Sequence, residues 1–184
     1  MPIQPGTQRL GPDNASLSVL TGRAGAAAKA GHDLVLRVTS WEAEVVIGED
    51  PADAGMELTA DATSLRVVEG TGGMQALGDD DLANIHQTID DEVLRREDIT
   101  FRSTRVRTEP GGSRIHAEGD LTLLGQTRPI GFELVIGDRG DLSATAVVEQ
   151  TAWDIKPYSA LFGALKVKDE VLVVLEGHAQ PQSR

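Results

Sequence analysis

Apolar and polar residues alternate along most of the chain, in short runs separated by glycine-rich turns. The runs lie at about residues 15–19, 34–38, 41–47, 56–62, 99–101, 115–123, 130–136, 142–148 and 171–179. A period of two places every second side chain on one face of a β-strand, so each run predicts a strand with one buried and one exposed face. About eight such strands predict an all-β domain that folds as a sandwich or closes as an antiparallel β-barrel.

One stretch departs from this alternation and predicts an α-helix over about residues 80–95. Its apolar residues recur at spacings of three and four, which is the pattern of one helix face: Leu82, Ile85, Ile89 and Val93. The acidic run 79–81 precedes this face, and Arg95 and Arg96 follow it, so the charges match the helix dipole. We therefore expect the apolar face to pack against the barrel and the acidic residues to face solvent.

Two interruptions of the alternation predict local features. The inward parity shifts by one residue at Thr39 and Ser40, which indicates a bulge or a sharp bend. Between two later runs, Gly125 and Gln126 suit a tight hairpin turn with glycine at the first central position. Pro129 cannot donate a backbone hydrogen bond, so it is expected at a strand start or at a bulge.

Many of the predicted inward positions hold small residues: Ala60, Ala62, Ala117, Gly119, Ala144, Ala146, Gly177 and Ala179. The interior of an eight-stranded barrel can be just filled by large side chains or can hold one small ligand. Aromatic residues make up only 3% of the chain, so the side chains alone are expected to leave part of the interior empty. The alternatives are that small residues let two sheets pack closely, or that a helix or loop fills the space.

The corner GDLTLLGQTRPIGFEL, residues 119–134, resembles the GdLTlhGvTkPv corner of YceI-like proteins, which are lipocalin-like barrels known for polyisoprenoid binding. Three further stretches occur in the family's order: GHDL at 31–34, ITFRSTRV at 99–106 after the helix, and YSALFGALKVKDEVLVVLE at 158–176. The resemblance covers about residues 10–179 and implies a single domain over 1–184, an extended lipocalin-like barrel of about eight strands with one inserted helix. It also implies an apolar tunnel that holds an isoprenoid or a similar fatty-acyl-type lipid.

The expected lining of this tunnel combines inward aliphatic positions with most of the aromatic residues: Leu17, Val19, Leu36, Leu58, Phe101, Ala117, Phe132, Ala144, Trp153, Tyr158 and Phe162. The last three belong to an irregular apolar segment, residues 152–166, that could line or cover the end of the tunnel. Lys156 and Tyr158 would then contact a polar head group. The same segment could equally plug the barrel end or pack on a second subunit of a homodimer.

Charge and composition exclude several classes of partner. The formal net charge of −12 argues against nucleic-acid binding and against an anionic membrane surface, because both need clustered lysine and arginine. Every apolar run is shorter than the roughly 18 residues that a membrane-spanning helix needs. The chain has no cysteine, and its first residues lack a secretory pattern, so a cytoplasmic location is expected.

No catalytic residue, cofactor or metal site is predicted. His116, Glu118 and Asp120 share a strand face and could in principle bind a divalent metal. That face is the one opposite the apolar residues, so it is expected to be the solvated outside of the barrel.

The sequence therefore favours binding, sequestration or carriage of a long apolar ligand. One alternative is an enzyme that acts on a lipid-like substrate, through His32 with Asp33 or through Lys156 with Tyr158. The other is a protein-interaction module of a stress response, which would use the outer sheet face or the acidic helix.

Overall fold

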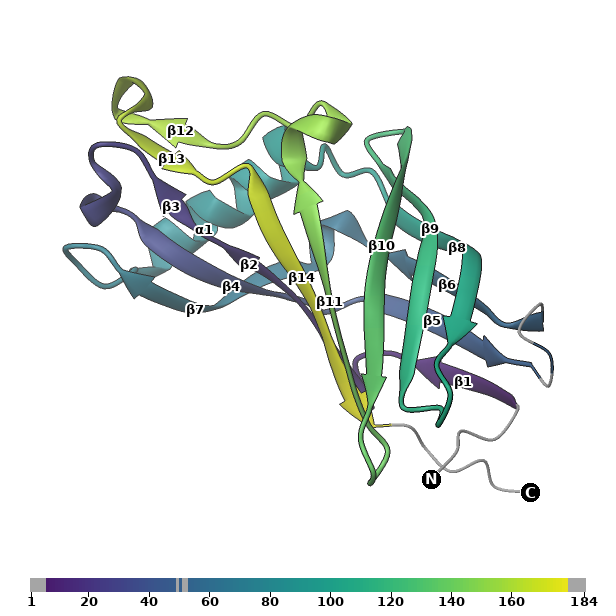
Figure 1. Ribbon diagram of the computed structural model, residues 1–184. Helices are drawn as coiled ribbons and strands as arrows, with labels where there is room; N and C mark the ends of the chain where they lie inside the picture. The colour runs from purple at the N-terminus through teal and green to yellow at the C-terminus, as the bar shows by residue number, and fades with distance from the viewer. Residues whose placement is uncertain (1–5, 49, 51–52, 179–184) are drawn as a thin grey trace.

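The computed structural model describes residues 6–48, 50 and 53–178, and its main feature is one strongly curled antiparallel β-sheet (Figure 1). In the order in which they pair, its eleven strands are β1 (Gly6–Leu10), β5 (Trp41–Ile47), β6 (Gly55–Ala60), β8 (Ile99–Thr108), β9 (Arg114–Leu123), β10 (Gln126–Ile136), β11 (Asp141–Glu149), β14 (Glu170–His178), β2 (Ala15–Thr21), β4 (His32–Val38) and β7 (Leu65–Gly72). A small second sheet joins β12 (Ser159–Ala160), β13 (Leu165–Val167) and β3 (Arg23–Ala24). The predicted all-β antiparallel class is confirmed.

The eleven strands come from eight segments of chain, because three bent segments contribute two strands each. The halves of these segments are β1 with β2, β4 with β5, and β6 with β7. β4 pairs with β2 and β7, whereas β5 pairs with β1 and β6. From β6 the strand pairing runs through β8, β9, β10, β11 and β14 to β2 and β4. Because β4 and β5 are halves of one bent segment, this order brings the sheet back to the segment near which it began. The sheet therefore curls round a common interior.

The predicted bend at Thr39 and Ser40 is confirmed as the sharp corner between β4 and β5. The N–H and the hydroxyl of Thr39 donate to the carbonyl of Ser64 at 3.0 and 2.9 Å, and the N–H of Ser40 donates to Ser64 Oγ at 3.1 Å. Ser64 belongs to the 3₁₀ turn η3 (Ala62–Ser64), which forms the corner between β6 and β7. These hydrogen bonds join the β4–β5 corner to the β6–β7 corner, at the point where each segment passes from one strand to the next.

The predicted helix is present as α1 (Asp79–Thr88), continued by a π-helical turn, η4 (Ile89–Val93). Gly78 is the N-cap, and its N–H donates to the Asp81 carboxylate at 2.9 Å, so the acidic run fills the first turn. The helix lies in the connection between β7 and β8, which do not pair with each other. Figure 1 shows it at the same end of the molecule as β3, β12 and β13, away from β1.

The helix presents a half-buried face to the interior. Ile85, Ile89 and Val93 face the interior as predicted, whereas Leu82 does not reach it. No residue of α1 or η4 is buried, so the helix is not an ordinary core helix. The first-turn carboxylates are exposed as expected, but Oδ1 of Asp90 is buried and has no hydrogen-bond partner among the described residues. Among residues 6–48, 50 and 53–178, no helix is long and apolar enough to span a membrane.

The hairpin between β9 and β10 differs from its predicted form. Its central residues are Leu124 and Gly125 rather than Gly125 and Gln126, and Leu123 pairs with Gln126. Both central residues have positive φ, 50° and 68°, as a type I′ turn requires. The prediction was wrong because a leucine in the left-handed region is not expected from its residue type.

Pro129 lies inside β10 rather than at its start. β10 pairs with β9 along residues 126–135, but its pairing with β11 begins only at Glu133. The part of β10 that contains Pro129 therefore has a partner on one side only, so a residue without an N–H is tolerated there.

Candidate ligand cavity

The curled sheet encloses a cavity of about 360 Å³. Strands from all round the sheet line it, together with α1, η4 and the segment between β11 and β14. The lining is almost wholly aliphatic or aromatic, and its polar side chains are Thr21, Asn84, Thr88, Gln150 and Tyr158. No charged residue of the described ranges lines it. A cavity of this size falls in the range of small-molecule sites, and the surface that it offers is apolar.

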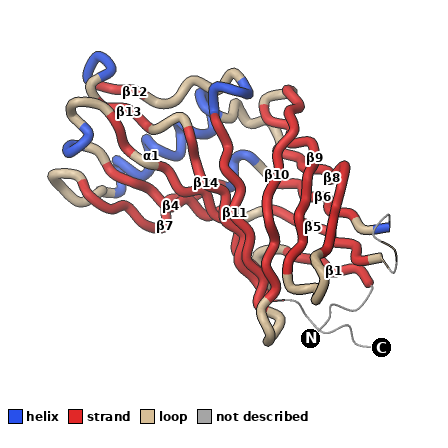
Figure 2. The backbone as a smooth tube through the Cα atoms, viewed as in Figure 1, coloured by secondary structure: helices blue, strands red, loops and turns tan. Residues whose placement is uncertain are grey.

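Phe101 and Phe132 separate this cavity from a filled core. Their ring centroids lie 5.4 Å apart with an interplanar angle of 55°, and Phe132 also borders a second space of only about 20 Å³. Val45, Ala117 and Leu134 line that small space. The interior is therefore open on the side of α1 and close-packed beyond the two rings. Figure 2 shows α1 at the same end of the molecule as β12 and β13.

The small inward residues divide between these two regions. Ala60, Ala144 and Ala146 line the cavity, as predicted. Ala117 borders the small space instead, and Gly119 lies against the ring of Phe101, so neither of them enlarges the cavity. Both of the alternatives considered from the sequence, an empty interior and close packing, thus occur in different parts of the same barrel.

The remaining small residues also serve packing. Ala62 is completely buried in the corner turn η3. A Cβ on Gly177 would lie 2.7 Å from the Cβ of Ala15, so glycine allows β14 and β2 to approach there. Ala179 lies outside the described residues.

Most of the residues predicted to contact a ligand border the cavity: Leu17, Val19, Leu36, Leu58, Phe101, Phe132, Ala144 and Tyr158. Ala117, Trp153 and Phe162 do not. Trp153 is buried in the core, where its Nε1–H donates to the carbonyl of Leu121 at 3.0 Å. Phe162 is fully exposed in the turn η6 (Leu161–Gly163). These three side chains lie outside the cavity lining, because strand parity does not reveal where along a strand the cavity ends, and an aromatic residue in a loop can face either way. Contact of the eleven residues with a ligand stays a prediction.

The segment that follows β11 forms one wall of the cavity and part of its rim. It starts with the turn η5 (Gln150–Trp153), where Gln150 Nε2 donates to the carbonyl of Lys168 at 2.9 Å. Ile155 is buried and lines the cavity, whereas Tyr158 both lines the cavity and is exposed. Asn84 on α1 is likewise both lining and exposed, so the cavity reaches solvent beside Tyr158 and beside Asn84. We call this region the mouth.

The contribution of the helix was missed as a site feature. Asn84, Ile85, Thr88 and Ile89 line the cavity. The apolar stripe was visible in the sequence, but a stripe of this kind ordinarily packs on a filled core. Only the tertiary structure shows that this face of the helix borders an empty space.

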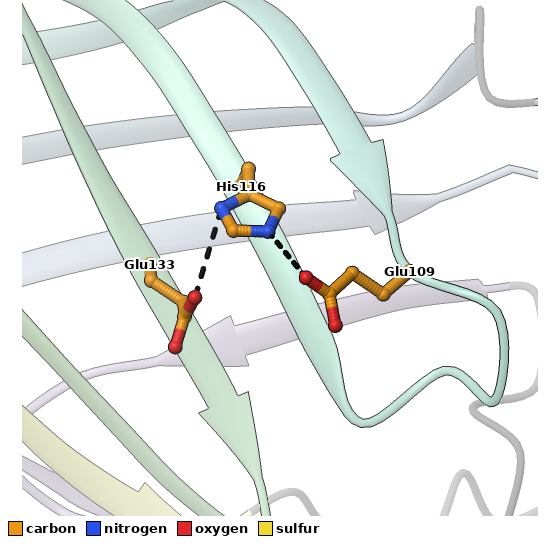
Figure 3. A group of neighbouring side chains, drawn as sticks. All are labelled: Glu109, His116 and Glu133. Carbon is orange, nitrogen blue, oxygen red and sulfur yellow. Dashed lines mark hydrogen bonds and ion pairs between the residues drawn. The ribbon is translucent and has the colours of Figure 1, made fainter.

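His116 lies in a group of charged side chains on the outside of the barrel, with partners other than those predicted (Figure 3). Its Nε2 lies 2.9 Å from Glu109 Oε1, and its Nδ1 lies 3.7 Å from Glu133 Oε2. Glu118 pairs instead with Arg107 at 3.7 Å. The solvated face predicted for His116 is therefore confirmed.

The group could hold a divalent cation, since one ligand atom from each of Glu109, His116 and Glu133 lies within 4.8 Å of the others. Two features weigh against that use. The ring nitrogens point to different carboxylates (Figure 3), and Arg114 Nη1 already binds Glu133 Oε1 at 2.7 Å. We interpret the group as a surface ion-pair network, and the absence of a bound metal stays a prediction.

Of the two residue pairs considered for an enzyme, His32 and Asp33 have partners outside the cavity. His32 Nε2 lies 2.8 Å from the carbonyl of Gln75, and Asp33 accepts a hydrogen bond from the N–H of Arg23 at 2.8 Å. Neither of them lines the cavity, and Lys156 does not line it either. Of the four residues in those two pairs, only Tyr158 borders the space in which a substrate would lie.

A sheet that curls round an apolar cavity, with one helix across a gap, is the architecture of a lipocalin-like binding protein. The chain belongs to the family of the YceI-like domain, whose model matches residues 12–179. The match confirms the family that the 119–134 corner suggested.

Solved structures of similar fold cover most of the chain. BcnA from Burkholderia cenocepacia has a TM-score of 0.61 at 16% identity, over 90% of this chain and 96% of that chain. A mutant CJ YCEI protein has a TM-score of 0.54 at 13% identity, over 78% and 82%. The YCEI protein of Campylobacter jejuni has a TM-score of 0.50 at 15% identity, over 77% and 82%. At these identities the likeness shows the fold alone. A search of curated proteins found no match.

Proposed function

We propose that the protein binds and carries one chain-like apolar molecule, an isoprenoid or a fatty-acyl lipid, inside the cavity. The observation that carries the proposal is the lining: among the described residues, about 360 Å³ of space is bounded by apolar side chains, five uncharged polar ones and no charged one. Such a lining excludes ionic or strongly polar ligands from the interior, because a buried charge without a partner is costly.

The polar lining residues suggest how the ligand is oriented. Asn84 and Tyr158 lie at the mouth, where a hydroxyl or carboxyl head group could receive hydrogen bonds while remaining near water. The chain would extend inward to Phe101 and Phe132. An alcohol or acid with one polar end fits this arrangement better than a molecule that is polar along its length.

The expected affinity is modest. Each buried CH₂ contributes about 0.8 kcal/mol, so about ten methylenes contribute about 8 kcal/mol. Association removes several kcal/mol of that through lost freedom of motion. A bound chain would also cover the faces of Ile85, Ile89 and Val93, which are only half-buried without it.

Carriage is favoured over catalysis. The polar side chains that line the cavity are hydroxyl and amide groups, and none of them is an acid or base that changes protonation near neutral pH. We propose that the protein is not an enzyme, that it needs no cofactor, and that it works in the cytoplasm. A homodimer stays a prediction.

Native mass spectrometry with farnesol and with palmitic acid tests the proposal. The parent protein should bind one molecule of at least one of them. Ala146→Phe fills the cavity and should abolish binding. Val147→Phe is the matched control, because Val147 is the next residue of β11 and is 53% exposed on the outer face. If Ala146→Phe binds as the parent does, the ligand does not lie in this cavity and the proposal is wrong.

A further inference from the structure

The lysines of this acidic chain gather at the cavity end of the molecule. The sequence contains four: Lys29, Lys156, Lys166 and Lys168. They lie in the turn η1 (Ala28–Ala30), in the segment before β12, in β13 and directly after β13, and all four are exposed. None forms an ion pair with a carboxylate of the described ranges, whereas arginines elsewhere do. Residues 155–168, which include the hairpin of β12 and β13, therefore carry three lysines and no carboxylate, although the exposed Asp79, Asp80 and Asp81 of α1 lie at the same end of the molecule.

Two apolar side chains project into solvent at the same end. Leu161 is 59% exposed and Phe162 is fully exposed, at the tip of the hairpin between β12 and β13. Both have positive φ, 52° and 55°, which is unfavourable for residues with a Cβ. A Cβ on Gly163 would lie 3.6 Å from Cε of Lys166, so a lysine stem lies beside the tip. The side chains of Leu161 and Phe162 therefore bury little apolar surface against the rest of this chain, although their backbone is strained.

This tip is continuous with the mouth of the cavity. Tyr158 and Val167 lie opposite each other at the base of the hairpin, where the N–H of Val167 donates to the carbonyl of Tyr158 at 2.9 Å. Both residues line the cavity. The small sheet also ties β13 to β3, and the N–H of Ala27 donates to the carbonyl of Ala164 at 2.8 Å, which brings η1 and Lys29 to the same region (Figure 1).

We propose that this end docks on an anionic lipid bilayer, with Leu161 and Phe162 inserted among the lipids and the lysines on the head groups. An aromatic tip flanked by long cationic side chains suits the interface between acyl chains and head groups. The exposed carboxylates outside the hairpin, including those of Asp79, Asp80 and Asp81 on α1, would be repelled by such a surface, so the approach is confined to the hairpin and its lysines. Of the carboxylates near the lysines in sequence, Asp33 pairs with Arg23, while Asp154 and Asp169 accept hydrogen bonds from Gln126 and Thr151. Glu170 is exposed.

Docking in this orientation would turn the mouth towards the membrane. In that respect the inference extends the proposed function, since a carried lipid could pass between bilayer and cavity without crossing water. The docking itself does not require a bound ligand, because the tip and the lysines lie outside the cavity. Failure of one proposal therefore leaves the other open to its own test.

Vesicle flotation tests the docking. The parent protein should float with vesicles of phosphatidylcholine mixed with phosphatidylglycerol, and much less with phosphatidylcholine alone or at high salt. Phe162→Ser should lower the partition coefficient about tenfold, from the loss of one buried aromatic side chain. Lys156→Ala with Lys166→Ala should also lower it. The matched controls are Val147→Ser, an exposed apolar residue on β11, and Arg128→Ala, an exposed cation on β10.

Three results would overturn the inference. The parent protein could fail to float with either kind of vesicle. The control variants could reduce flotation as much as the tip and lysine variants do. Phe162→Ser could instead abolish a dimer seen by sedimentation without vesicles, which would make the tip an interface between two copies. Ala146→Phe should still float, and Phe162→Ser should still bind farnesol, so the two proposals are separated.

Discussion

Gly119 of β9 leaves the space that the ring of Phe101 on the neighbouring strand β8 occupies. A Cβ on Gly119 would lie 2.5 Å from Cζ of Phe101 and 2.5 Å from the backbone oxygen of Arg102. Because the second contact is with backbone, it cannot be relieved by turning the ring alone. The glycine thereby lets Phe101 reach Phe132 and close the inner end of the cavity.

We expect Gly119→Ala to destabilise the protein by about 2–4 kcal/mol, through overpacking against both ring and backbone. Gly131→Ala is the matched control on the adjacent strand β10, where a Cβ would have ordinary contacts of 3.6 Å or more. That change should leave stability unchanged or raise it slightly, since alanine is preferred to glycine within a strand. Urea unfolding of both variants checks this, and equal losses would contradict the role given to Gly119.

The two regions of the interior should respond in opposite ways to added bulk. Ala146→Phe fills empty space and should leave the melting temperature unchanged or raise it. Ala117→Phe enters the packed region beside a space of only about 20 Å³ and should cost about 1–3 kcal/mol or more. Thermal melts of the two variants measure this. A loss at both positions would show that the cavity closes in solution.

The two tryptophans offer a second matched comparison. Nε1 of Trp153 donates to the carbonyl of Leu121 at 3.0 Å, whereas Nε1 of Trp41 is buried without a partner among the described residues. Trp153→Phe should therefore cost about 1 kcal/mol more than Trp41→Phe, because only the first loses a hydrogen bond. Denaturant unfolding decides it, and a larger loss at Trp41 would contradict the assigned bonding.

The Thr63 hydroxyl, which donates to Asp61 Oδ1 at 2.7 Å, is the main cause that holds the pKa of Asp61 below its ordinary value of 3.8. The Thr63 N–H adds to the effect. A lowered folded-state pKa stabilises the protein above about pH 3.8, and that contribution is lost as the pH falls through the folded-state value. Thr63→Val should raise the pKa of Asp61 in a carbon NMR titration. Thr145→Val, at an exposed threonine on β11, should leave it unchanged.

Much of the fold could be predicted because each strand alternates cleanly. In β9, residues Ile115, Ala117 and Leu121 are buried and His116 is exposed, as the parity requires. What could not be predicted was position along the strands. Ala117 and Ala144 have the same residue type and the same inward parity, yet one borders packed core and the other borders the cavity.

The loops and the helix were less predictable for a related reason. The sequence shows that residues 152–166 are apolar, but burial of Trp153 and exposure of Phe162 depend on neighbouring strands that are far away in the chain. In the same way, the helical stripe shows which face of α1 is apolar. It does not show that the space beneath is empty.

That space makes the helix the covering element of the cavity, which leads to a final prediction about Ile89. This residue begins the π-helical turn, lines the cavity and is half-buried. Ile89→Asp should cost about 1–3 kcal/mol, less than in a closed core because water can reach the carboxylate through the mouth. It should also weaken farnesol binding at least tenfold, since a charge would face the apolar chain. Gln87→Asp adds the same charge at an exposed position of α1 and should change neither property. Urea unfolding and native mass spectrometry on both variants measure the two effects. If the two variants behave alike, the face of the helix that carries Ile89 does not cover the cavity.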